Sequence, residues 1–151
     1  MKREIIILTA SVLTLVFGCA LEELLPKFAG VGFPVLLMSS IYLASKRNMA
    51  ASLMFAVAAG AAEDSLCALP FATSAAFFAV SAVFVQFTEL KWSTFACAFP
   101  AYQLWLGMCI ESQNGSIFGR FLTSIPVGLV TAGFVWCILG WVELKGAMDE
   151  K

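Results

Sequence analysis

Long apolar stretches separated by short polar breaks run through this chain from one end to the other. Six stretches approach the length of about 20 residues that a helix needs to cross a membrane. They cover residues 5–21, 28–45, 48–66, 70–88, 92–110 and 117–142. Because they are too long and too evenly apolar for the alternating strands of a membrane barrel, the pattern predicts six transmembrane helices.

The break between the third and fourth stretches decides between six spans and five. A five-span chain would have to merge these two stretches into one apolar segment of about 40 residues, twice the length of a span. Glu63, Asp64 and Pro70 interrupt that segment. An acidic pair followed by a proline favours a hairpin of two helices.

Composition points to the same class of protein. The chain has 151 residues, of which 61% are hydrophobic and 13% are charged, whereas soluble domains are about 45–50% apolar and about 25% charged. No polar stretch is long enough for a soluble domain, so we expect a single integral membrane domain over residues 1–151 and an all-α polytopic fold.

The first stretch follows Lys2 and Arg3, as the apolar part of a signal peptide would, and the segment LVFGC ending at Cys19 is similar to a lipoprotein cleavage box. Phe17 is bulky where such boxes prefer a small residue. The later stretches also need a membrane partner, so we expect residues 5–21 to stay as a span.

The distribution of basic residues predicts the orientation. With six spans both termini lie on one side of the membrane. If that side is the cytoplasm, it holds seven of the nine basic residues and the outer segments hold Lys27 and Arg120 alone. Cytoplasmic segments of membrane proteins are enriched in Lys and Arg, so the N- and C-termini are predicted to be cytoplasmic.

The residue types in the chain argue against most catalytic and metal-binding chemistry. The chain has no histidine, which removes the usual general base, zinc ligand and haem ligand. Its five cysteines are widely spaced and form no CxxC pair, so we expect buried, unpaired thiols. No nucleophile with a base, phosphate-binding loop or metal-ligand cluster is present, so we expect a protein that is not an enzyme and has no cofactor.

Glu63 and Asp64 are the main anomaly, because they end an apolar stretch that begins near Asn48. Asp64 would lie roughly 24 Å along a helix axis, close to the edge of a ~30 Å hydrocarbon layer. Either both side chains reach outer water, or Asp64 turns into the bundle and is paired. Arg120 is the first candidate for its partner and Lys27 the second, since arginine can bind a carboxylate through two hydrogen bonds.

Small residues recur at every fourth position in the third stretch, at Ser52, Ala56 and Gly60. This spacing lays small side chains on one helix face and permits close contact with another helix. The face can either pack inside this protein's own bundle or serve as a docking surface for a partner protein.

The order of these features resembles the MreD family of rod shape-determining membrane proteins. FPVLLMSSIYLASKR, in which Pro34 leads the span, resembles the family's second span and its basic inner loop. AVAAGAAEDSLCALPFATSAAFFAV resembles the end of the third span and the return into the membrane. Gly60 and Asp64 match the family's glycine four residues before an aspartate. The family usually has glycines within the next eight residues, where this chain has Ala68 and Ala72.

This resemblance implies a non-enzymatic scaffold of the bacterial cell-wall elongation machinery in the inner membrane. Its implied partners are the lipid bilayer, an MreC-like periplasmic protein, an MreB-type filament and cell-wall synthases, with no nucleic acid. The family fold is also similar to the substrate-binding subunits of energy-coupling-factor transporters. The alternative function is therefore a subunit that binds a vitamin-type solute, with a polar cavity lined by Asp64, Gln103, Glu111 and Arg120.

Overall fold

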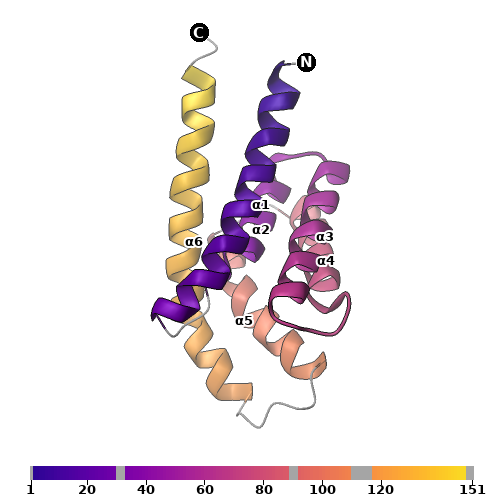
Figure 1. Ribbon diagram of the computed structural model, residues 1–151, viewed down its shortest axis with the longest axis vertical. Helices are drawn as coiled ribbons and strands as arrows, with labels where there is room; N and C mark the ends of the chain where they lie inside the picture. Colours follow the sequence, from indigo (N-terminus) through magenta and orange to yellow (C-terminus); the bar gives the residue numbers. More distant parts are fainter. Residues whose placement is uncertain (1, 30–32, 89–91, 110–116, 149–151) are drawn as a thin grey trace.

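The structure, a computed structural model, describes residues 2–29, 33–88, 92–109 and 117–148, and this part of the chain is all-helical (Figure 1). The six helices are α1 (Lys2–Ala29), α2 (Val35–Lys46), α3 (Met49–Leu66), α4 (Thr73–Phe87), α5 (Trp92–Cys109) and α6 (Ile117–Met148). The predicted all-α bundle is therefore confirmed for the described residues.

Successive helices run in opposite directions along the bundle, so the two termini lie at the same end (Figure 1). We call this the terminal end. The α2–α3 turn lies there, and the α3–α4 turn lies at the opposite end. This up-and-down arrangement follows from short connections between neighbouring helices, which leave antiparallel packing as the accessible geometry.

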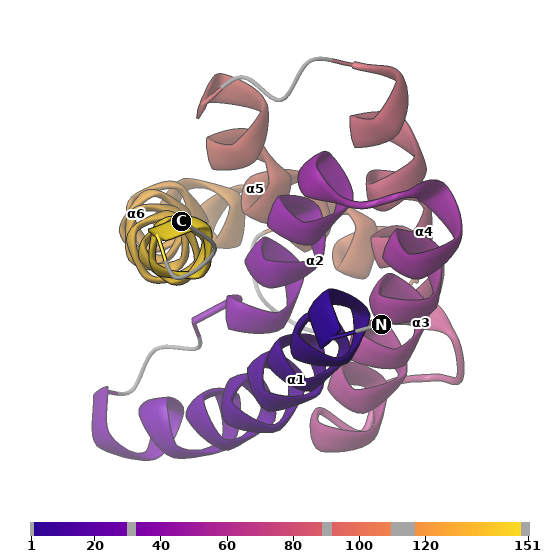
Figure 2. The ribbon, with the colours of Figure 1, turned by 90° about the horizontal axis from the view of Figure 1, so that it is seen from above.

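The shortest helix, α2, forms the centre of the bundle. It contacts all five other helices, and Figure 2 shows it enclosed by them when the bundle is seen from above. Every residue from Val35 to Ala44 is buried, and Leu36, Leu37 and Met38 are 0% exposed. Every other helix has exposed residues among those whose side chains the structure describes, whereas α2 is buried along almost its whole length and forms the core of the bundle.

Asn48 starts α3 as the sequence predicts. Its side-chain Oδ1 accepts a hydrogen bond of 2.9 Å from the backbone N–H of Ala51, which satisfies one of the free donors of the first turn. Near the same end, the Gln86 side chain of α4 donates to the backbone oxygens of Ala44 and Arg47, the latter at 2.8 Å. Gln86 thereby fixes the end of α4 to the α2–α3 turn.

Helix bounds follow the predicted spans closely at α3 and α5 and less closely elsewhere. α1 continues eight residues beyond the predicted end at residue 21, and α2 begins at Val35 rather than near residue 28. The predicted span ends before Glu22, but a helix continues past an acidic residue whose side chain finds a partner, as that of Glu22 does with the backbone N–H of Leu36. α6 likewise runs to Met148, beyond residue 142.

Small residues of α3 face the inside of the bundle. Ser52, Ala56 and Gly60 are all buried, with Ser52 2% and Ala56 0% exposed. Of the two interpretations of this stripe, packing within the protein's own bundle is the correct one. The face is occupied mainly by α4, which is the most extensively contacted neighbour of α3.

Two described helices are long and apolar enough to cross a membrane, by length and composition alone. They cover Met49–Leu66 and Phe121–Trp141, and only 28% of each window is buried inside the bundle. α2 and α4 are shorter apolar helices. The core helix of a soluble protein also passes this test, but it is mostly buried, whereas most residues of these two helices are not buried.

The expected burial of the cysteines is wrong for the thiols of Cys67, Cys97, Cys109 and Cys137, which are exposed on the bundle, while Cys19 is half-buried. All five are free, as predicted. Many apolar residues of the stretches that contain these cysteines are exposed, so apolar neighbours in the sequence do not imply that a cysteine is buried.

Candidate functional site

Three acidic residues, Glu22, Glu63 and Asp64, lie towards the end opposite the termini, which we call the acidic end. The Asp64 side chain is 6% exposed and points into the bundle. Its Oδ1 accepts a hydrogen bond of 2.7 Å from the backbone N–H of Ser74, and its Oδ2 accepts one of 3.4 Å from that of Ala75. Both donors belong to the first turn of α4.

Asp64 therefore caps a helix other than its own. The residue at the N-cap position of α4, Ala72, has no side chain that could cap it. The first N–H groups of a helix lack partners within the helix, and the positive end of the helix dipole favours a negative charge there. The carboxylate of Asp64 meets both needs, which is why this ionisable group can be buried.

Gly60 brings α4 close enough for this cap. A Cβ added to Gly60 would come within 2.6 Å of the backbone nitrogen of Ala75 and closer still to its Cα. Any side chain at this position would push α4 away from α3. Gly60 and Asp64 lie one helical turn apart on α3, so the glycine sets the distance and the aspartate binds the α4 amides that this distance brings near.

The turn between α3 and α4 requires two left-handed residues. Ala68 has φ 50° and Ala72 has φ 64°, a region that residues with a Cβ adopt at a cost of roughly 1–2 kcal/mol. The backbone oxygen of Asp64 accepts from the N–H of Leu69 at 2.9 Å and closes the end of α3. These are the two positions at which the resembled family would carry glycine.

Side chains of α5 hold the start of α4 from the other side. The indole Nε1 of Trp105 donates to the backbone oxygen of Thr73 at 2.9 Å. The hydroxyl groups of Ser74 and Tyr102 are hydrogen-bonded to each other, and both residues are buried, at 0% and 2% exposed. The first turn of α4 is thus fixed by Asp64 from α3 and by two aromatic residues from α5.

Glu22 caps α2 in the same manner. Pro34, at the N-cap position of α2, offers no side-chain hydrogen bond, as expected of proline. The Glu22 Oε1 atom of α1 accepts a hydrogen bond of 2.7 Å from the backbone N–H of Leu36. Two helices that lack a capping residue of their own, α2 and α4, each receive a carboxylate from the preceding helix.

The third carboxyl group, that of Glu63, is only partly exposed. Its side chain is half-buried, and its Oε2 atom is buried without a hydrogen-bond partner. Glu63 is therefore less exposed than a fully solvated marker of the turn would be.

The acidic residues also affect the thiol that ends α3. Partial desolvation, followed by the negative charges of Glu63, Glu22 and Asp64, raises the pKa of Cys67 to about 11. A thiol with this pKa stays protonated near neutral pH, so Cys67 is a poor nucleophile there. Within the described residues, no group of three or more His, Cys, Asp or Glu side chains could hold a metal ion.

Among the predicted site residues, the structure brings together Gly60, Glu63 and Asp64 and places Pro34 at the start of the neighbouring helix α2. The predicted partners of Asp64, Arg120 and Lys27, lie outside the residues whose side chains are described. The role of Glu22 was not predicted from the sequence. Its only signal was a second acidic pair, at the end of the first apolar stretch.

Comparison of the chain with protein-family models, with curated proteins and with solved structures found no match. The class that fold and site define is an all-α bundle of six described helices with carboxylate caps between helices. The resemblance to the MreD family stays a prediction based on the sequence motifs.

Proposed function

We propose that the protein is a multi-pass protein of the bacterial inner membrane with six transmembrane helices and cytoplasmic termini. The observation that carries this proposal is the exposed apolar surface. Met54 is 75%, Val80 68%, Val130 64% and Phe134 54% exposed on α3, α4 and α6. Soluble monomers rarely expose large contiguous apolar patches, and lipid is the solvent that such helices suit.

The proposed role in this membrane is that of a non-enzymatic scaffold for cell-wall elongation. The support is the resemblance to the MreD family, to which the structure adds physical reasons for the motif. Gly60 permits a close helix contact, and Asp64 caps α4. Ala68 and Ala72, where that family carries glycines, hold the left-handed backbone that glycine adopts most easily.

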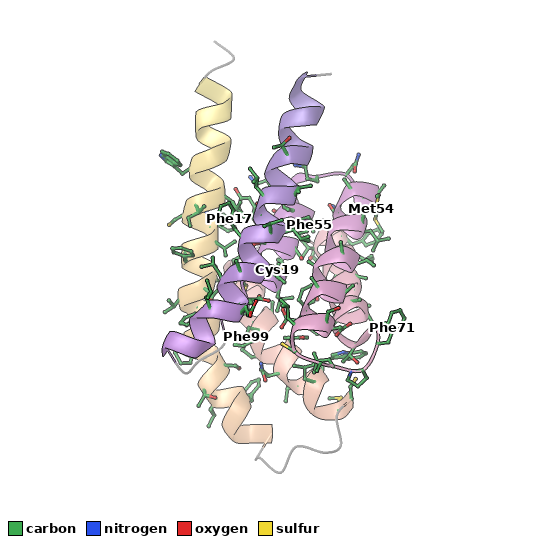
Figure 3. All side chains as sticks on the ribbon, viewed as in Figure 1. Phe17, Cys19, Met54, Phe55, Phe71 and Phe99 are labelled. Carbon is green, nitrogen blue, oxygen red and sulfur yellow. The ribbon has the colours of Figure 1, made fainter. Side chains whose placement is uncertain are left out.

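The surface proposed to meet partners is the turn between α3 and α4 at the acidic end. Phe71 is 98% exposed and points away from the bundle (Figure 3). Large aromatic side chains that project from a turn are typical anchors of protein interfaces. In the proposed orientation this turn faces the periplasm, where an MreC-like protein would be reached.

Purification of the tagged protein from native membranes in a mild detergent tests the role. The proposal expects co-purification of an MreC-like periplasmic protein and of cell-wall synthases, and lower recovery of the periplasmic protein with Phe71→Ala. Met54→Ala is a matched control, since Met54 is also exposed but lies along the side of α3 (Figure 3). Recovery of a transporter ATPase pair without these partners would contradict the scaffold role and favour the solute-binding alternative.

A further inference from the structure

A pocket lies at the terminal end of the bundle, where α2 and α4 end beside α6. Its volume is about 310 Å³, and its described lining consists of the last residues of α2, the last residues of α4 and Trp136 of α6. Sites that bind small molecules have volumes of about 300–1,000 Å³. The pocket is therefore large enough for a small polar group such as a lipid headgroup.

Contacts within the protein hold the walls of this pocket in place. The Gln86 side chain of α4 donates to the backbone oxygen of Ala44 in α2. Trp136 packs edge to face against Tyr42 and Phe95, with ring centroids 5.5 and 5.7 Å apart. The pocket is thus preformed, and a ligand would bind without paying for the ordering of these side chains.

Two consecutive basic residues give this end of α2 a positive charge. Lys46 lines the pocket and is exposed, and its ammonium group has three donors, so it can bind an anion in addition to another partner. The Nε atom of Arg47 is buried and has no hydrogen-bond partner among the described residues, so the neighbouring guanidinium has unused donor capacity. The described lining contains no acidic residue. A phosphate group is the ligand chemistry that these donors suit.

Apolar surface adjoins the pocket. Trp136 is exposed, as are Phe84 and Phe87, which flank the lining residues Val85 and Gln86 along α4. A free phosphate ion makes no use of such a surface, whereas the acyl chains of a lipid can lie along it. Basic pockets between transmembrane helices on the cytoplasmic side bind the headgroups of anionic lipids, and tryptophan is enriched at the headgroup level.

We propose that this pocket binds the phosphate headgroup of an anionic phospholipid, such as phosphatidylglycerol, from the cytoplasmic leaflet. Lys46 binds the phosphate, and Trp136 packs against the lipid where its chains begin. The inference rests on the proposed membrane placement and orientation, which put the terminal end at that leaflet. Among the described helices, α4 and α6 are not neighbours, so a lipid held between them ties together two parts of the bundle and stabilises the folded protein.

Thermal unfolding of the full-length protein in non-ionic detergent micelles, followed by circular dichroism, tests the site. We expect added phosphatidylglycerol to raise the unfolding midpoint, because a ligand of the folded state stabilises it. Phosphatidylcholine with the same chains, and inorganic phosphate, should raise it far less. Lys46→Gln should weaken the apparent affinity for phosphatidylglycerol roughly fivefold, as expected for one basic charge. Lys27→Gln is the matched control, since it removes the same charge near the other end of α1 and should keep the affinity.

Ser45→Leu tests the pocket itself, because it fills part of the cavity and leaves both basic residues in place. We expect this variant to lose the effect of phosphatidylglycerol. An unchanged effect in either Lys46→Gln or Ser45→Leu, or an equal effect of phosphatidylcholine, would overturn the proposal. An equal effect of inorganic phosphate would overturn the assignment to a lipid and indicate a free anion. A negative result in micelles leaves the proposed membrane placement intact, because accessibility labelling in cells measures that placement separately.

Discussion

At the scale of single residues, the α3–α4 turn contains the most evident local strain. Ala68 and Ala72 both have positive φ, at 50° and 64°. Glycine adopts this region without the clash of a Cβ. The turn is kept because the contacts on either side of it, Asp64 with α4 and the packing at Gly60, determine its path.

Replacing these alanines by glycine should stabilise the protein. For Ala68→Gly and Ala72→Gly, relief of the left-handed strain, roughly 1–2 kcal/mol, exceeds the entropic cost of glycine in the unfolded chain, about 0.4–1 kcal/mol. We expect each variant to raise the midpoint of thermal unfolding in detergent micelles, followed by circular dichroism. The control is Ala58→Gly, in the exposed interior of α3, which should lower the midpoint. A lower midpoint of thermal unfolding in both Ala68→Gly and Ala72→Gly would mean that the turn is not strained as described.

The burial of Asp64 also belongs to this scale. Removing its carboxylate by Asp64→Ala leaves the buried N–H groups of Ser74 and Ala75 without a partner, at a cost of about 1–3 kcal/mol. Asp64→Asn keeps an acceptor for the N–H of Ser74, so its loss in free energy of unfolding should be clearly smaller. Unfolding by added SDS measures both losses.

The same unfolding measurements in SDS distinguish two roles of Asp64, a cap on the backbone of α4 and an ion pair with Arg120. If Asp64 acts through the α4 backbone, the losses caused by Asp64→Asn and Arg120→Lys should add when the two changes are combined. A combined loss smaller than that sum would show that the two side chains interact.

At the scale of helices, the arrangement depends on how closely α3 and α4 approach. Gly60→Ala places a methyl group against the backbone of Ala75, which cannot give way as a side chain can. We expect a loss of about 1–3 kcal/mol, as for overpacked cores, together with weaker capping by Asp64. Gly133→Ala is the matched control, because a Cβ at Gly133 of α6 meets nothing within 4 Å, and helix propensity predicts a slight gain. Equal effects of the two variants would contradict the close contact at Gly60.

The sequence predicted α3 well because its limits have local causes. Asn48 caps the start, and the acidic pair and Pro70 mark the end. It predicted the end of α1 poorly, since Glu22 looked like a boundary and is in fact a partner of α2. A hydropathy pattern counts Glu22 as a charged residue. It does not show the backbone N–H of Leu36, 14 residues further along the chain, which donates the hydrogen bond that permits the burial of Glu22.

The inward turn of Asp64 could be proposed from the sequence, but its partners could not. From a sequence, a carboxylate is paired with a basic side chain, here that of Arg120, because the sequence lists side chains and does not show which backbone groups lie near them. The partners in the structure are backbone N–H groups of α4, which every helix possesses. Only the close contact at Gly60 determines which of them come within reach.

At the scale of the whole molecule, the central claim is that the bundle spans a membrane with its terminal end in the cytoplasm and its acidic end outside. The apolar surface of α3 and α6 favours a position in the membrane, and the distribution of the basic residues favours this orientation. The turns at the two ends of α3 are therefore predicted to lie on opposite sides of the membrane.

Labelling of single cysteines with a membrane-impermeant maleimide tests this claim most directly. In a background with the native cysteines replaced by serine, Phe71→Cys marks the acidic end and Lys46→Cys the terminal end, and both positions are exposed in the bundle. The account predicts that Phe71→Cys is labelled in intact spheroplasts and that Lys46→Cys is labelled only after the membrane is permeabilised. Labelling of both in intact spheroplasts, or of Lys46→Cys alone, would contradict it.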